Sequence, residues 1–286
     1  QEKNIYMGIF ITEYIILVVP IVIFMLVRKY NFKEIFRLNK ISSKQVGITA
    51  GIVVLSYPVG VFLNLIGIAI INTFGEVKGN PIPTPETIPE FLLGLFLFSI
   101  TPGICEEIMF RGFLMKAYEK SGIKKAIICT GILFGVFHFN LQNFLGPTYL
   151  GILFGYMVYK TNSLYIGMIG HAINNGIALI LSWGSEKAIK FAESMDPNIT
   201  NKVMEEAATK TSFSTQEILS LLLGVGIVAT LCSFGVYALL KKLPGENTID
   251  DSDQSQKIGI LNMIPVFIVG ILFLLLSYIY IQHVKF

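Results

Sequence analysis

The sequence predicts an all-α integral membrane protein, a polytopic helix bundle with about eight transmembrane helices. Of its 286 residues, 53% are hydrophobic and 14% are charged, whereas soluble domains carry about 25% charged residues. Apolar runs close to the ~20 residues that span a bilayer recur from end to end. We therefore expect one integral-membrane domain over residues 1–286, with no soluble domain attached.

The predicted spans lie near residues 7–28, 46–74, 88–117, 123–139, 146–160, 163–183, 215–241 and 258–281. The first is too long for a signal-peptide core, so we expect a transmembrane helix there. Pro102-Gly103 should interrupt the third span, because proline removes a backbone donor and kinks or breaks a helix. We expect one piece that ends near Ile100 and a second helix from Gly103 to about Lys120.

Basic residues predict how the bundle is oriented. Four connections, 28–45, 116–125, 160–162 and 241–257, fall on one side of the predicted bundle and hold 14 of the 22 Lys and Arg residues. Cytoplasmic loops carry the excess of Lys and Arg, so this side should be cytoplasmic and both termini should lie outside. The first of these connections has apolar residues between its basic ones, as amphipathic segments at the headgroups do.

Other features of the composition exclude some functions. No basic run is interleaved with exposed aromatic residues, so nucleic acid is not an expected partner. The three cysteines, Cys105, Cys129 and Cys232, all lie in apolar segments and give no disulfide framework. Glu13 lies in the first span, where we expect it near the outer interface.

Three consecutive hydrophobic stretches carry polar groups that are costly inside a membrane and usually mark a functional site. In the first, Glu107 and Arg111 are four residues apart, share a helical face and can pair. Glu106 is rotated by ~100° from Glu107 and points elsewhere. We therefore expect Glu107 and Arg111 to give structural support and Glu106 to do chemistry. The alternative is that both carboxylates only brace a kink.

The second stretch ends at His138, one helical turn after Phe134. A histidine in this place is usually an interfacial residue. However, Ser121-Gly122 forms a natural turn, and Glu106 and His138 each lie sixteen residues from Gly122. An antiparallel hairpin about this turn would bring the two to the same depth, where they could share a water molecule.

The third stretch contains His171 and Asn175, which are four apart and project from one helical face. Asn174 lies off that face, where an interhelical polar clasp is a reasonable alternative. His283 follows the last predicted span and is expected to be solvated. Any chemistry that needs histidine must therefore use His138 and His171.

These motifs, Glu106-Glu107-x-x-x-Arg111, Phe134-x-x-x-His138 and His171-x-x-x-Asn175, resemble those of the CPBP family of intramembrane proteases. That family includes the type II CAAX prenyl endopeptidases and bacterial proteins linked to bacteriocin processing and self-immunity. The resemblance covers about residues 95–180, the expected catalytic core. It implies that Glu106 activates a water together with His138, and that His171 and Asn175 stabilise the oxyanion.

A metal mechanism is the competing account, because Glu106, His138 and His171 form a His₂Glu set like some catalytic zinc sites. The sequence has no HExxH, and zinc would leave Asn175 as the only listed oxyanion donor. We favour a site without an obligatory cofactor, with zinc as the alternative.

The expected function is an intramembrane endopeptidase that cleaves a peptide or protein substrate, lipidated or not, at the bilayer of a prokaryotic cell membrane. A non-catalytic scaffold or bacteriocin self-immunity protein that keeps the protease fold is the alternative. An ion-coupled transporter is a weaker one, because transporters often show repeated halves and we find no internal repeat. The substrate itself is not predicted.

Overall fold

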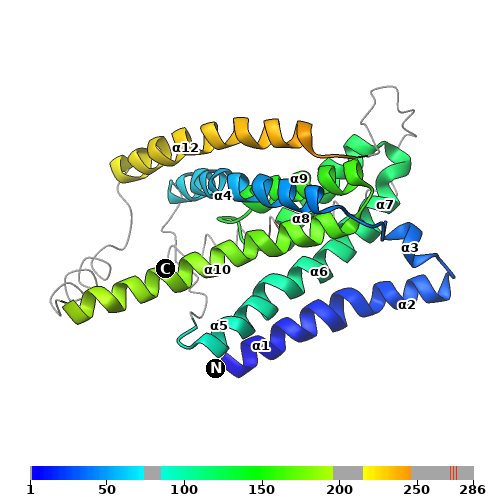
Figure 1. Ribbon diagram of the computed structural model, residues 1–286, viewed down its shortest axis with the longest axis horizontal. Coiled ribbons are helices and arrows are strands. Elements are labelled where there is room, and N and C mark those ends of the chain that lie inside the picture. The colour runs from blue at the N-terminus through cyan, green and yellow to red at the C-terminus, as the bar shows by residue number, and fades with distance from the viewer. Residues whose placement is uncertain are drawn as a thin grey trace.

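Long helices dominate the computed structural model (Figure 1), which describes residues 2–73, 85–195 and 215–245, together with residues 271, 273 and 275. No strand occurs in this part of the chain. The predicted all-α class is therefore confirmed.

The helices follow one another with short connections. Their bounds are α1 Glu2–Phe10, η1 Ile11–Val18, α2 Val19–Val27, α3 Phe32–Ile35, α4 Ser43–Asn72, α5 Ile88–Gly94, η2 Leu95–Ile100, α6 Thr101–Glu107, η3 Ile108–Leu114, α7 Met115–Tyr118, η4 Glu119–Ser121, α8 Ile123–Phe137, α9 Leu145–Thr161, α10 Leu164–Met195 and α12 Thr215–Lys242. The segments η1, η2 and η3 are π-helical, and η4 is a 3₁₀ turn.

Several helices are long and apolar enough to cross a bilayer, as an integral membrane protein requires. In the described residues these are Ile5–Val27, Ser43–Asn72, Ile88–Ser121, Leu164–Met195 and Gln216–Lys242. The two helices of the α8–α9 hairpin, with 15 and 17 residues, are shorter. The predicted span at 258–281 lies outside the described residues except for three positions. The number of eight spans therefore remains a prediction.

The expected break at Pro102-Gly103 is wrong, because the chain is helical without interruption from Ile88 to Ser121. Two π-helical segments, η2 and η3, lie in this helix, and η2 comes directly before the proline. There the amide of Thr101 donates to the carbonyl of Phe96, five residues back. This wider turn accommodates a residue that has no amide hydrogen and whose ring crowds the preceding turn.

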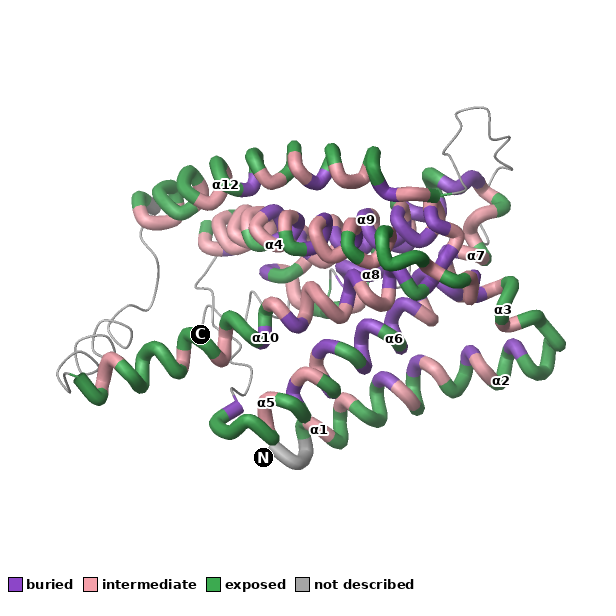
Figure 2. The backbone as a smooth tube through the Cα atoms, viewed as in Figure 1, coloured by how far each residue is buried: buried purple, intermediate pink, exposed green. Residues whose placement is uncertain are grey.

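The helices pack in a layered bundle (Figure 1). α12 lies along α4, and α8 and α9 form an antiparallel pair. α10 contacts α4, α6 and α9, so it connects the centre of the bundle to the long helix with the acidic motif. On the other side of α6 lies η1, the middle of the first span. Figure 2 shows buried residues gathered on α6, α8, α9 and α10, with exposed residues along the outer faces of α2 and α12.

The four basic connections meet at one end of the bundle, as predicted. Arg37 forms an ion pair with Glu119 of the 116–125 turn. The side chain of Asn39 donates to the carbonyl of Asn162, at 2.7 Å. Lys160 donates to the carbonyl of Leu240, at the end of α12, at 2.6 Å. Segments far apart in sequence thus share one basic end, and positive-inside orientation predicts that this end is cytoplasmic.

Candidate active site

A buried ion pair forms the centre of the site. Nη1 of Arg111 lies 2.5 Å from Oε1 of Glu107, and both side chains are completely inaccessible. Nη2 of Arg111 donates to the carbonyl of Gly151 in α9, at 3.1 Å. The pairing expected from the four-residue spacing is therefore present, and Arg111 also connects this helix to α9. Breaking such a pair would leave an uncompensated buried charge.

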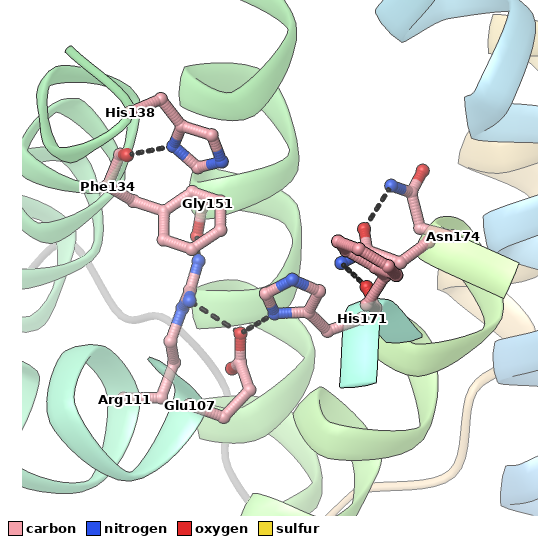
Figure 3. Close-up of polar contacts among 9 residues, drawn as sticks. Glu107, Arg111, Phe134, His138, Gly151, His171 and Asn174 are labelled. Carbon is pink, nitrogen blue, oxygen red and sulfur yellow. Dashed lines mark hydrogen bonds and ion pairs between the residues drawn. The ribbon is translucent and has the colours of Figure 1, made fainter. Parts of the chain in front are cut away.

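His171 in α10 joins the same carboxylate. Its Nδ1 lies 3.1 Å from Oε1 of Glu107, and its exposed fraction is 3% (Figure 3). Gly167, one turn earlier on α10, makes this approach possible. A Cβ atom added there would lie 2.6 Å from Oε2 of Glu107 and 2.7 Å from Val158. The absence of a side chain at Gly167 therefore permits the contact between the two helices.

An aromatic ring, that of Phe134, lies among the charged and imidazole groups (Figure 3). Its centroid is 5.0 Å from the ring of His138 and 5.5 Å from that of His171. The guanidinium carbon of Arg111 lies 4.4 Å from the same centroid, a cation–π arrangement. Phe134 thus contacts both histidines and the arginine, a role that the sequence did not reveal beyond its place in the motif.

His138 caps the C-terminal end of α8. Its Nδ1 lies 2.8 Å from the carbonyl oxygen of Phe134. This carbonyl can only accept, so Nδ1 carries the hydrogen and Nε2 of the neutral ring is an acceptor. The residue is exposed at the surface of the described bundle. Within the described residues, no hydrogen bond joins His138 to Glu106, so their cooperation stays a prediction.

Asn175, one turn after His171, forms a hydrogen bond in the interior. Its Nδ2 donates to the carbonyl of Phe98, at 3.1 Å, and its Oδ1 accepts from Asn174, at 3.2 Å. In a regular α-helix the amide of residue 102 would donate to the carbonyl of Phe98, but Pro102 has no amide hydrogen. Asn175 therefore provides a donor where the proline removes one, and its second N–H remains available.

Glu106 differs from its neighbour Glu107 as the helical geometry predicts. Its side chain is 8% exposed, and its buried Oε2 has no hydrogen-bond partner. Its carboxyl group interacts electrostatically with Glu107 and Arg111, and also with Glu13 of the first span. Buried polar groups are nearly always hydrogen-bonded, so this carboxyl is exceptional.

The zinc alternative finds no support in the arrangement of these side chains. Within the described ranges, no three His, Cys, Asp or Glu side chains are grouped as ligands of a metal ion. Nδ1 of His171 is directed to Glu107 instead. The set Glu106, His138 and His171 does not fit a tetrahedral site as arranged.

The comparisons with known proteins agree with the motif resemblance. Residues 88–177 match the family model described as Type II CAAX prenyl endopeptidase Rce1-like. A protein of Bacillus subtilis (strain 168) named "Putative membrane peptidase YdiL" is 27% identical over 108 residues. That alignment covers 37% of this chain and 44% of the relative, less than half of its length. No solved structure matches.

The matched region contains all three motifs, from Glu106 to Asn175, on the helices that form the site. The resemblance to the type II CAAX prenyl endopeptidases is therefore confirmed for residues 88–177 of this membrane protein.

Proposed function

We propose that this chain is an intramembrane endopeptidase that hydrolyses a peptide bond of a membrane-associated substrate. The observation that carries the proposal is the buried carboxyl of Glu106, with an unpartnered oxygen, beside a bonded network of Glu107, Arg111 and His171. A purely structural carboxylate would be paired, as Glu107 is. The family match and the named relative both concern peptidases.

In the proposed reaction Glu106 is the general base and His138 holds the water. Glu106 takes a proton from the water as its oxygen bonds to the scissile carbonyl carbon, and the carbonyl oxygen becomes an oxyanion. The C–N bond then breaks, and the leaving nitrogen receives the proton from Glu106. Positioned acids and bases of this kind typically accelerate a reaction by about 10²–10⁴-fold.

His171 and Asn175 are proposed to stabilise the oxyanion. Nδ1 of His171 is held by Glu107, which leaves Nε2 for the substrate. Because a carboxylate oxygen only accepts, Nε2 can donate to an oxyanion when the ring is protonated. The second N–H of the Asn175 amide would supply another donor. Preorganised donors at a developing oxyanion are usually the largest single contribution to catalysis.

The substrate class follows from the place of the site. Because the catalytic groups lie on helices long enough to span a bilayer, the scissile bond must belong to a segment that reaches the membrane. A lipidated tail, a leader peptide and the terminus of a membrane protein all meet this requirement. A prokaryotic cell membrane is the proposed location.

The test compares cells and proteoliposomes that carry wild type, Glu106→Gln or Glu90→Gln. Glu90 is a matched control, because it lies on the same long helix and its carboxyl caps the first turn. Peptides and protein termini that appear with wild type and Glu90→Gln should be absent with Glu106→Gln, while all three proteins fold. Cleavage retained in folded Glu106→Gln would refute the proposal and leave a non-catalytic scaffold or immunity protein as the alternative.

A further inference from the structure

A third acidic side chain, Glu13, lies in the interior of the bundle. The sequence led us to expect it near the outer interface, but its exposed fraction is 7%. Its Oε2 atom is buried and has no hydrogen-bond partner. An unpaired carboxyl group in this setting costs free energy, and acidic residues inside a membrane are functional by default.

The segment that carries Glu13 packs on the helix that carries Glu106. η1 contacts α6, and the hydroxyl oxygen of Tyr14 lies 3.2 Å from Oγ1 of Thr101 at the start of α6. Figure 1 shows the first span running beside α6. η1 is also π-helical, a conformation that is frequent at functional sites. The local geometry therefore presents Glu13 to the same region as Glu106.

The two carboxyl groups share the same unusual state. Each is more than nine-tenths buried, and each has a buried Oε2 without a hydrogen-bond partner. Glu13 is also the charged group that acts most strongly on Glu106, ahead of Glu107 and Arg111. Two carboxylates that share a buried site cannot both ionise without a large electrostatic cost.

The groups around the pair determine which carboxyl is charged. The titratable side chains described on the elements packed against η1 are Tyr6 of α1, Cys105, Glu106 and Glu107 of α6, and Arg111 of η3, with Tyr14 on η1 itself. Arg111, the cation among them, acts on Glu106. By Coulomb's law a nearby cation stabilises the carboxylate form, so the negative charge belongs on Glu106.

Building on the proposed function, we propose that Glu13 and Glu106 form a carboxyl pair that holds one proton at neutral pH, with the proton on Glu13 and the charge on Glu106. Glu13 is then a positioning residue, which acts on the reaction through the general base. In one turnover Glu106 takes a proton from water and returns it to the leaving nitrogen, and Glu13 keeps its own proton throughout.

The pair also predicts how activity ends at high pH. When Glu13 loses its proton, the site carries a second negative charge close to the oxyanion that forms on the substrate. Additional negative charge there raises the barrier, because oxyanion stabilisation is electrostatic. The alkaline limb of kcat/KM against pH should therefore report the ionisation of Glu13.

The first test is infrared spectroscopy of the purified protein at neutral pH, read at the carbonyl-stretching band of protonated carboxyl groups. Glu13→Gln should remove one such band, whereas Glu106→Gln should remove a carboxylate band instead. In wild type the protonated band should disappear on alkaline titration. Loss of the protonated band in Glu106→Gln, or its persistence in Glu13→Gln, would overturn the assignment. If Glu13→Gln does not fold, titration of wild type and Glu106→Gln still decides it.

The second test is the pH profile of cleavage. Glu13→Gln should move the alkaline limb to higher pH by about one to three units, the range of shifts that a neighbouring charge produces. Tyr14→Phe is the matched control, because it breaks the contact to Thr101 without changing a carboxyl, and its limb should stay in place. An unmoved limb in Glu13→Gln refutes the pair but leaves the proposed function intact. The proposed function fails instead if folded Glu106→Gln still cleaves.

Discussion

Nδ1 of His171 lies 3.1 Å from Oε1 of Glu107, the same oxygen that accepts from Arg111. One buried carboxylate thus connects a cation on its own helix to an imidazole on α10. This contact changes the role of Glu107 from that of a brace for Arg111 alone to a second role, in which it also sets the orientation of His171. Mutation of Glu107 should therefore affect both stability and cleavage.

A double mutant separates the two roles of Glu107. Glu107→Ala leaves Arg111 buried and unpaired, which should lower the free energy of unfolding by about 3–5 kcal/mol. Combining it with Arg111→Met removes both charges and should recover much of that loss. Cleavage should stay low in the double mutant, because His171 still lacks its acceptor. Unfolding in detergent and cleavage of a common substrate measure the two effects. Restored cleavage in the double mutant would show that the Glu107–His171 contact is dispensable.

Gly167→Ala tests the close approach of α10 to Glu107. The new Cβ would lie 2.6 Å from Oε2 of Glu107, and overpacking of this kind typically costs about 1–3 kcal/mol. Displacement of Glu107 should also lower kcat. Gly184→Ala on the same helix is the control, since nothing lies within 4 Å of a Cβ there. Thermal unfolding of the two variants should therefore differ, and equal midpoints would contradict the packing account.

Features that depend on local spacing could be predicted from the sequence. Glu107 and Arg111 pair because residues four apart share a helical face. The same geometry rotates Glu106 away from this pair, and its carboxyl is indeed unpartnered on one oxygen. The grouping of the basic connections followed from the count of helices between them.

Features that depend on contacts between distant helices could not be predicted. The partner of His171 is 64 residues away, and no periodicity within α10 points to it. Pro102 was expected to break its helix, since the π-helical turn that accommodates it leaves no local sequence signal. Glu13 was expected at an interface because its burial depends on packing of the first span against α6.

Cysteine labelling tests which end of the bundle is cytoplasmic. In a protein with the three native cysteines replaced by alanine, Lys120→Cys reports the basic end and Glu86→Cys reports the opposite end, and both positions are exposed. A membrane-impermeant thiol reagent added to intact cells should label Glu86→Cys. It should label Lys120→Cys only after permeabilisation. The reverse pattern would invert the predicted topology.

Asn175 and Pro102 offer a test that separates structure from catalysis. Asn175→Ala removes the side-chain donor to the carbonyl of Phe98, and leaving a buried acceptor unsatisfied costs about 1–3 kcal/mol. Adding Pro102→Ala introduces a backbone amide that can donate to this carbonyl, so the free energy of unfolding should partly recover. If Asn175 also stabilises the oxyanion, cleavage should remain low in the double mutant. Pro102→Ala alone is the control and should keep cleavage. Recovery of both stability and cleavage would mean that Asn175 serves only to satisfy the backbone beside the proline.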